Sequence, residues 1–541
     1  MINNTNPYRT GIINLVRKFG VLKLHNLVRQ ITIVGGGTAG WLTAGVIAAE
    51  HMANSDSGVK VTLVESPDIK PIGVGEGTWP TMRGTLQKMG IDETEFLREC
   101  DASFKQGAKF AKWVTGAEDD FYYHPLVLPE GYEKINLAPY WQPQSDKVAF
   151  ADAVSFQGHL CEKGLAPKQI TTPEYAHVAN YAYHLDAAKF SVFLQKHCTE
   201  KLGVRHVLDH VTGVNASENG DISSVSTKQH GDITGDLFID CTGFNSLLLG
   251  KHYKIPFINK KHILFNDTAL AVQVPYQTEQ DAIASHTIST GQSAGWIWDI
   301  GLPSRRGVGH VFSSAHTTDE QAEIELRDYI RPSLGKQADA IGIRKIPIEP
   351  GHRKLFWHKN CVAVGLSAGF LEPLEASALV LVELSAAMIS EQLPANREVM
   401  DIVAKRFNNK FLYRWDRIID FLKLHYVLTK RTDTDYWQDN CLAETIPEDL
   451  QTLLKLWRYE SPWQLDFDHA DEVFPSASYQ YVLYGMGFET MARHTSKRSD
   501  NIELAQMTFQ KNAQLTQKLL AGLPNNRDLI NKIKQYGLQK I

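Results

Sequence analysis

The sequence predicts an α/β fold in which a Rossmann-like module carries a mostly helical C-terminal part. Residues 31–34 are all β-branched, which is typical of a buried parallel strand. Gly35, Gly37 and Gly40 follow with the spacing G-x-G-x-x-G, a helical stretch comes next, and a second strand ends at Glu65. Strand, glycine turn, helix and strand with a terminal acid, in this order, predict a dinucleotide site of the FAD/NAD(P) type.

Each residue of this turn has a predicted task. The glycines provide a tight turn, let the backbone approach a pyrophosphate, and allow close packing of helix on strand. Thr38 and Ala39 stand between the second and third glycines, next to the helical stretch 41–50, and free N–H groups and the dipole at a helix N-terminus favour phosphate. Glu65 is expected to bind a ribose hydroxyl of the adenosine. The pattern does not distinguish FAD from NAD.

Composition and charge exclude several classes of function. The 541 residues are 43% hydrophobic and 22% charged, as in an ordinary globular protein. A formal net charge of −5 argues against nucleic-acid binding, which normally needs a basic excess. No apolar stretch is long enough for stable membrane insertion. The six cysteines are scattered without a C-x-x-C pair, so we expect a cytoplasmic protein with neither a disulfide framework nor a metal site.

The chain is expected to have three parts. Residues 1–29 hold five Lys or Arg and no Asp or Glu, and we interpret them as a flexible basic leader. A targeting or membrane-surface helix fits the same composition. Residues 30–385 form the discontinuous dinucleotide-binding module, and 386–541 form the helical C-terminal part packed on it.

Periodicity predicts the elements within these parts. Long loops are expected for 115–180 and strands for 264–312, and a strand that ends at Asp240 re-enters the nucleotide fold. Helical patterns dominate later in the chain, at 375–393, 396–428, 447–457 and 502–523.

Four motifs point to a family. They are Gly-Gly-Gly-Thr-Ala-Gly-Trp at 35–41, Ile-Gly-Val-Gly-Glu-Gly-Thr-Trp-Pro at 72–80, Gly-Trp-Ile-Trp-Asp-Ile at 295–300 and Gly-Phe-Leu-Glu-Pro-Leu-Glu at 369–375. Shorter matches lie at 180–186, 201–206 and 431–434. With these motifs in order, the chain resembles a flavin-dependent halogenase of the tryptophan halogenase family, whose flavin module has the glutathione-reductase type of fold.

The resemblance implies a cofactor and a reaction. Reduced FAD, supplied in trans by a flavin reductase through diffusion, reacts with O2 to give a flavin hydroperoxide. Bromide or chloride attacks it, and the resulting hypohalous acid crosses a tunnel to a lysine beside a small aromatic substrate. The flavin ring is expected near the turn 72–78, which includes Glu76, and near Gly365 and Leu366. Whether the protein forms a homodimer stays an open question.

The resemblance also assigns catalytic and halide-binding residues. Lys105 ends the Ala-Ser-Phe-Lys segment and is expected to form a haloamine or to hydrogen-bond the hypohalous acid. Glu375 is the second glutamate of Glu-Pro-Leu-Glu, and would polarise the hypohalous acid or accept the proton of the arenium ion. Ser377 and Ala378 stand where tryptophan-using members have Thr-Gly, and their backbone N–H groups make a predicted halide site.

The residues themselves allow plainer interpretations of Lys105. With Lys109 and Lys112 it has the spacing i, i+4, i+7 of a solvated helix face. The flanking residues Phe104 and Phe110 indicate burial instead, which would lower the pKa of the lysine and make a neutral amine available.

The other motif residues have alternatives too. Glu372 and Glu375 could cap a helix that begins near Pro373. Trp296 and Trp298 could pack beside the flavin or act as a gate, and Gly301 stands where the family usually has proline. His124 matches a substrate-pocket histidine, although a lone histidine among aromatic residues is more often structural.

The C-terminal part departs from the tryptophan-using members, which hold the amino acid with a Tyr-Tyr pair and a Glu. Residues 465–475 contain no counterpart, so a less polar, electron-rich arene such as an indole is the predicted substrate. Two alternatives stay open: an FAD-dependent aromatic monooxygenase, which would need neither Lys105 nor Glu375, and a catalytically silent flavin-binding protein.

Overall fold

The structure is a computed structural model that describes residues 27–68, 75–467, 469, 472–491 and 501–540. The leader predicted at 1–29 therefore lies outside the described residues, except for its last three. Of these, Val28 is buried, and its N–H donates to the carbonyl of Ala395 at 3.1 Å.

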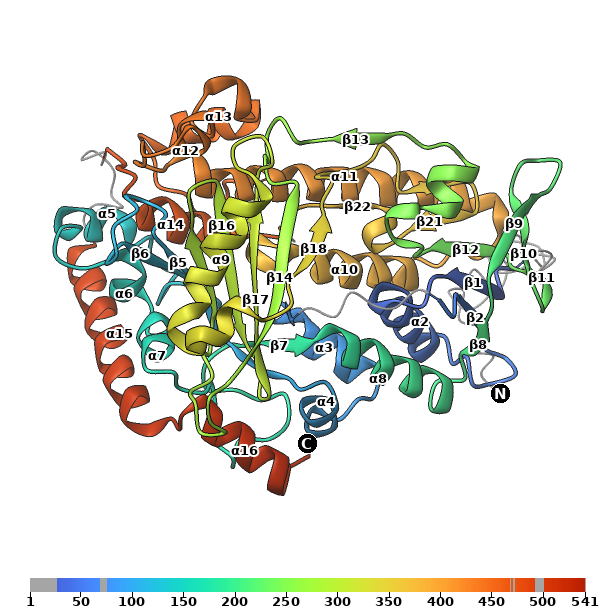
Figure 1. The fold of residues 1–541 in the computed structure, drawn as a ribbon, viewed down its shortest axis with the longest axis horizontal. Helices are drawn as coiled ribbons and strands as arrows, with labels where there is room; N and C mark the ends of the chain where they lie inside the picture. The colour runs from blue at the N-terminus through green and yellow to red at the C-terminus, as the bar shows by residue number, and fades with distance from the viewer. Residues whose placement is uncertain (1–26, 69–74, 468, 470–471, 492–500, 541) are drawn as a thin grey trace, which may run out of the picture.

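A mostly parallel sheet forms the core of the dinucleotide-binding module, on the right in Figure 1. Its strands follow the order β20 (Trp357–His358), β21 (Cys361–Ala363), β12 (Leu237–Asp240), β1 (Gln30–Val34), β2 (Lys60–Glu65) and β8 (Arg205–Leu208). β1 is parallel to both β2 and β12. The predicted return of the chain to the nucleotide fold at Asp240 is thus confirmed.

Helices cover this sheet. α2 (Thr38–Glu50) follows the glycine turn directly and packs between α8 (Ala187–Glu200) and α10 (Ser377–Glu391). Because most residues of α2 are buried, its pattern is apolar all round rather than amphipathic. A small antiparallel sheet of β9 (Val211–Ala216), β10 (Ile222–Thr227) and β11 (Gly231–Thr234) lies at the far right of Figure 1.

A second large sheet lies on the left of Figure 1. Its order is β18 (Arg344–Pro347), β14 (Thr268–Pro275), β17 (Arg305–Phe312), β16 (Gly295–Gly301), β15 (Thr287–Gly291), β5 (Gly107–Ala111) and β6 (Phe121–Pro125), and α9 (Asp319–Leu334) covers one face. The strands expected within 264–312 are confirmed. The loops expected for 115–180 are wrong for β6, α5 (Ala138–Trp141), α6 (Phe150–Val154) and α7 (Gln157–Glu162), because these elements are too short to show a period.

A short antiparallel sheet connects the two large ones. It consists of β3 (Gly75–Gly77), β7 (Ala182–Asp186) and β4 (Ser103–Lys105). β3 contacts β16 and β17 of the second sheet, and β7 contacts α8 of the module. Lys105, the last residue of β4, is therefore placed where the two halves meet. Another small sheet holds β13 (Phe257–Asn259), β19 (Gly351–Arg353) and β22 (Gly369–Phe370).

The later part of the chain is helical, as predicted. Its helices are α11 (Arg397–Val427), α12 (Asp435–Asp439), α13 (Glu448–Trp457), α14 (Ser476–Gly485), α15 (Ile502–Gly522) and α16 (Asn526–Tyr536). α14 packs on β6, α15 on α6 and α7, and α16 on α4 (Glu93–Glu99). The division predicted at 385/386 falls inside α10, which also contacts α3 (Thr81–Lys88).

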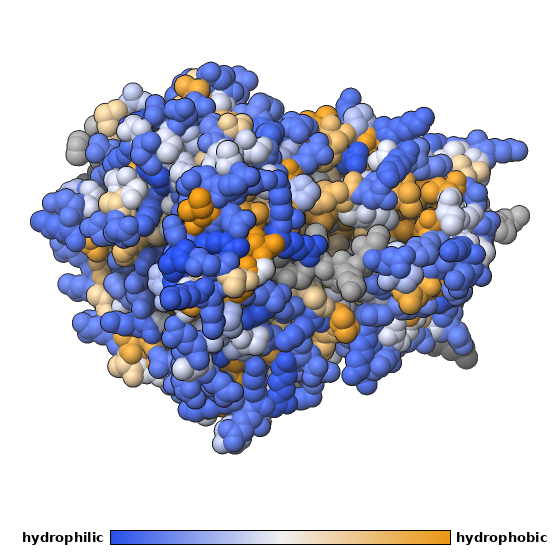
Figure 2. Space-filling model, in the orientation of Figure 1, coloured by the Kyte–Doolittle hydropathy of each residue, from blue (hydrophilic) through white to orange (hydrophobic). Residues whose placement is uncertain are grey.

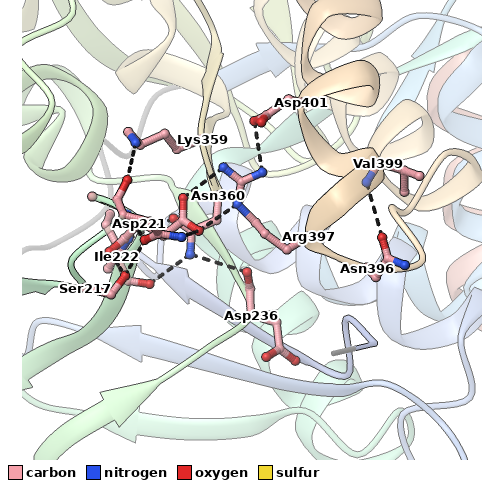
Figure 3. Close-up of polar contacts among 12 residues, drawn as sticks. Ser217, Asp221, Ile222, Asp236, Lys359, Asn360, Asn396, Arg397, Val399 and Asp401 are labelled. Carbon is pink, nitrogen blue, oxygen red and sulfur yellow. Dashed lines mark hydrogen bonds and ion pairs between the residues drawn. The ribbon is translucent and has the colours of Figure 1, made fainter. Parts of the chain in front are cut away.

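Polar contacts fix the start of α11 on the module, as Figure 3 shows. Asn396 caps the helix by accepting from the N–H of Val399 at 3.2 Å. Arg397 donates to Asp221, with 2.6 Å between Nε and Oδ2. Asn360 both donates to and accepts from the backbone of Ile222, at 2.8 and 2.9 Å. These contacts hold the start of α11 against the small sheet β9–β11, and so help to position the residues that α11 carries.

Hydrophilic side chains cover most of the face in Figure 2, with apolar residues in separate patches. Across the part of the chain that the structure describes, no helix is both long and apolar enough to cross a membrane.

Candidate active site

One cavity of about 710 Å³ extends from the glycine turn to the middle of the molecule. Its volume is in the range of ligand and cofactor sites. Of the predicted cofactor residues, it is lined by Gly35, Gly37, Thr38, Ala39, Glu65, Glu76, Gly365 and Leu366. Lys105, Glu375, Ser377 and Ala378 line the same cavity. The structure therefore brings together the residues predicted for the cofactor, the halide and catalysis.

The glycine turn has the geometry that a pyrophosphate needs. Gly35 has a φ of +117°, which disfavours any other residue. A Cβ on Gly40 would lie 1.9 Å from the carbonyl oxygen of Gly35, so this glycine serves helix–strand packing. A Cβ on Gly37 would meet no atom of the described residues within 4 Å. Gly37 thus faces open cavity at the N-terminus of α2, and the residues present fit a dinucleotide.

Two acids lie along the cofactor part of the cavity. Glu65 ends β2 beside Gly36, where a Cβ would lie 2.1 Å from the carboxyl carbon of Glu65. The side-chain Oε2 of Glu65 is 2.9 Å from Nε2 of His206. Burial, and secondly the nearby Asp186, raise the pKa of Glu76 to about 7. A carboxyl with this pKa can be present as the neutral acid near neutral pH, and can then donate a hydrogen bond.

Lys105 is buried, as its aromatic neighbours predicted. The residue is 3% exposed, and its Nζ donates to the carbonyl of Thr78 at 3.4 Å. Burial lowers the pKa of Lys105 to about 8, against an opposing effect of Glu375. The alternative of a helix face shared with Lys109 and Lys112 is wrong, because Lys105 ends β4 whereas Lys109 lies in β5. The i, i+4, i+7 spacing of the three lysines is therefore a coincidence, because these residues lie in and after two strands and not in a helix.

Glu375 lies in a strained turn just before α10. Its φ is 62° and that of Ala376 is 55°, both in the left-handed region that non-glycine residues rarely adopt. Trp79 holds this turn, because its indole Nε1 donates to the carbonyl of Glu375 at 2.8 Å. Burial would raise the pKa of Glu375, but His124, His425 and Lys105 outweigh it and keep the pKa below its ordinary value.

Glu372 does not cap the helix, and the capping interpretation of the two glutamates is wrong. Oε2 of Glu372 accepts from Asn266, Trp296 and Tyr426, each at 2.7 Å. The helix α10 begins only at Ser377, and no side chain of the described residues caps it. Glu372 therefore connects the Glu-Pro-Leu-Glu turn to the tryptophan motif of β16 and to α11.

Ser377 and Ala378 are the first two residues of α10 and line the cavity. The N–H groups in the first turn of a helix have no partner within that helix, and the dipole makes them favourable for an anion. The small side chains leave the backbone accessible from the cavity. Among the described residues, no three His, Cys, Asp or Glu side chains come together in a way that could hold a metal ion.

His124 does not line the cavity, but its side chain contacts the carboxylate of Glu375. Its Nδ1 is 2.7 Å from Oε1 of Glu375, and its Nε2 is 2.9 Å from the hydroxyl of Ser478. Its assignment to the substrate pocket stays a prediction.

Three residues around Glu375 were not predicted from the sequence: His425, Tyr122 and Ser478. Tyr122 lies two residues before His124 on β6 and so shares its face of the strand, a signal that period-2 reasoning could have used. His425 lies two residues after the buried Lys423 near the end of α11, and Ser478 carried no signal.

A dinucleotide-binding module whose cavity also holds a buried lysine and glutamate defines a cofactor-dependent enzyme. Comparisons with known proteins identify which one. The sequence model of the tryptophan halogenase family matches residues 30–501. Tryptophan 6-halogenase SttH of Streptomyces toxytricini is 32% identical over 479 residues, which cover 85% of this chain and 89% of that protein.

Solved structures agree with the sequence comparison. A tryptophan halogenase of Shewanella frigidimarina NCIMB 400 is 50% identical, with a TM-score of 0.93 over 96% of this chain and 99% of that one. BrvH, a flavin-dependent halogenase from Brevundimonas sp. BAL3, is 31% identical, with a TM-score of 0.81 over 93% of this chain and 99% of that one. The chain belongs to the tryptophan halogenase family and is a flavin-dependent halogenase, which confirms the resemblance seen in its sequence.

Proposed function

We propose that the enzyme halogenates a small, electron-rich arene of the indole type, with Lys105 and Glu375 as its catalytic residues. The observation that carries this proposal is their position: both are buried, and both line the cavity that begins at the glycine turn. Hypohalous acid formed at one part of such a cavity can reach the other without entering bulk water.

FAD would be held along the first part of this cavity. Gly35, Gly37, Thr38 and Ala39 would accommodate the pyrophosphate, with Glu65 at the ribose. Glu76, Gly365 and Leu366 would lie against the flavin ring. Gly40 supports the site through packing alone. When bound, reduced FAD together with O2 supplies the oxidising power that converts a halide to hypohalous acid. A separate flavin reductase would deliver the reduced cofactor by diffusion.

Residues of the chain itself would bind the halide, transfer the halogen to the arene and remove the proton. The N–H groups of Ser377 and Ala378 hold the halide at the start of α10. The neutral amine of Lys105 attacks the halogen of hypohalous acid, so that an N–halogen bond forms, the O–halogen bond breaks and water leaves. The arene then attacks this halogen, so that a C–halogen bond forms and the N–halogen bond breaks, with its electron pair left on the nitrogen of Lys105, which takes up a proton and becomes the amine again. Glu375 accepts the proton of the arenium ion, whose C–H electron pair restores the aromatic ring.

The substrate class follows from the segment 465–475. Of the acids in this segment that the structure describes, Asp466 accepts from the indole Nε1 of Trp457 at 2.8 Å, and Glu472 accepts from the hydroxyl of Tyr413, so each already has a partner within the protein. Free tryptophan would leave its charged groups without partners, which costs several kcal/mol. We infer preference for indole, halogenation at the electronically favoured C3, and bromide over chloride because bromide is oxidised more easily.

A competition experiment tests this proposal. Equimolar indole and tryptophan are incubated with the enzyme, FAD, a flavin reductase and either halide, and the products are identified by mass spectrometry. We expect mainly 3-bromoindole. Predominant 5-, 6- or 7-halotryptophan contradicts the substrate assignment. A hydroxylated arene would indicate a monooxygenase, and flavin reoxidation with no product from a wider arene panel would indicate a silent flavoprotein.

A further inference from the structure

Two histidines contact Glu375, and the far nitrogen of each lies on a hydroxyl group. His124 has Nδ1 at 2.7 Å from Oε1 of Glu375 and Nε2 at 2.9 Å from Oγ of Ser478. His425 has Nδ1 at 2.6 Å from the hydroxyl of Tyr122, and its Nε2 lies 3.4 Å from the same Oε1, within ion-pair distance but without a hydrogen bond. Within the described residues, Oε2 of Glu375 has no hydrogen-bond partner.

This cluster is enclosed by aromatic rings. The side chains of His425, His124 and Glu375 are 0%, 7% and 6% exposed. Phe110 stacks on the rings of both Tyr122 and His425, with centroids 4.8 and 4.5 Å apart. Such walls fix where an imidazole lies, but they do not decide which of its nitrogens carries the proton. A hydrogen bond to the other nitrogen decides that.

The hydroxyl of Tyr122 can make this choice for His425. Burial raises the pKa of Tyr122 well above its ordinary value, so the phenol keeps its proton and has it available to donate to Nδ1 of His425. Burial also lowers the pKa of His425 to about 3, so that histidine is neutral and carries its single proton on Nε2, facing Glu375. A carboxylate only accepts, so Nδ1 of His124 donates to Glu375, while the hydroxyl of Ser478 contacts the other nitrogen and holds the ring in this orientation.

We propose that Tyr122 and Ser478 are positioning residues, which act through His425 and His124 to direct two N–H groups at Oε1 of Glu375 and leave Oε2 for the substrate proton. This inference rests on the proposed function, in which Glu375 takes that proton. The other charged group facing Glu375 is Lys105 from β4. The hydroxyls keep the carboxylate ionised and oriented without touching the substrate.

The test is the pH profile of halogenation, measured as bromoindole formed per flavin reoxidised in the complete enzyme with a reductase. Tyr122→Phe keeps the stacked ring but removes the donor, so His425 can adopt the other tautomer with its lone pair toward Glu375. Ser478→Ala removes the hydroxyl that contacts Nε2 of His124, so that this ring is held less firmly against Glu375. Lys105 sets a first limb near pH 8, and Glu375 sets a second limb at lower pH, where the profile becomes steeper. We expect each variant to move this second, lower limb toward neutral pH by about one unit and to leave the first in place, since hydrogen bonds to the charged form lower a pKa.

Matched controls come from the same elements. Tyr123→Phe removes the neighbouring hydroxyl on β6, which contacts Glu162 on the opposite face of the strand. Ser476→Ala removes a hydroxyl of α14 that contacts Tyr132. Both controls should keep the wild-type lower limb. Ser478→Thr retains a hydroxyl and should restore it.

The outcomes separate this inference from the proposed function. If Tyr122→Phe and Ser478→Ala lose rate equally at every pH, or keep the wild-type profile while Glu375→Gln is inactive, the positioning role is wrong and the proposed function stands. If Glu375→Gln halogenates at the wild-type rate, the proposed function itself fails. Should Tyr122→Phe not fold, the Ser478→Ala and Ser478→Thr pair decides the question alone.

Discussion

The glycine turn and the Glu375 turn line one cavity but are built in opposite ways. At the first, glycine occupies the position with positive φ, and one continuous segment presents its backbone to the cavity. At the second, Glu375 and Ala376 themselves have positive φ. Groups from β6, α11 and the segment before α3 hold Glu375 in place. Local sequence thus encodes the proposed cofactor site, whereas the proposed catalytic turn depends on residues from several distant elements.

We expect the largest loss of halogenation when Lys105 is replaced, because no neighbouring side chain can take the place of its amine. Lys105→Ala should reduce halogenated product by about 1,000-fold. FAD binding and flavin reoxidation should persist, because the glycine turn is untouched. Product mass spectrometry and flavin absorbance measure the two steps. Lys109→Ala, which alters a partly exposed lysine of β5 paired with Glu162, is the matched control. A near wild-type product yield from Lys105→Ala would show that the lysine has no catalytic role.

Glu375→Gln should have the next largest effect, a reduction of about 100-fold in halogenation. The amide can still accept from His124 but cannot take a proton from the arenium ion. The burial of the site makes the loss of charge tolerable to the fold, so the melting temperature should change little. Product formation that stays at the wild-type rate would assign proton removal to another group.

These two turns also show how far sequence reasoning reaches. The strand, helix and glycine tasks were predictable because residues adjacent in sequence carry them, and β1, α2 and β2 appear where expected. Lys105 and Glu375 came only from the family motifs, since period-based reasoning placed one on a helix face and the other at a helix cap. His425 and Ser478 could not be predicted, because their distance to Glu375 depends on how α11 and α14 pack.

Two glycine substitutions should separate binding from folding at the first turn. Gly37→Val should weaken FAD binding by about 100-fold yet leave the fold intact, because a side chain there meets only open cavity. Gly40→Ala should instead destabilise the protein by about 1–3 kcal/mol, because its Cβ would overlap the carbonyl of Gly35. Flavin titration and thermal melting distinguish them. A Gly37→Val variant that retains tight flavin would contradict the assigned pyrophosphate site.

The smallest expected effect is a pH dependence that comes from Lys105. Burial lowers its pKa to about 8, so the neutral amine is roughly a tenth of the total at pH 7 and nine tenths at pH 9. Because the proposed step needs this neutral form, product per flavin reoxidised should rise about tenfold over this range. Measuring the ratio removes any pH effect on the earlier flavin step. A ratio that falls instead over the same range would mean that protonated Lys105 acts by hydrogen-bonding hypohalous acid, and the haloamine step would be wrong.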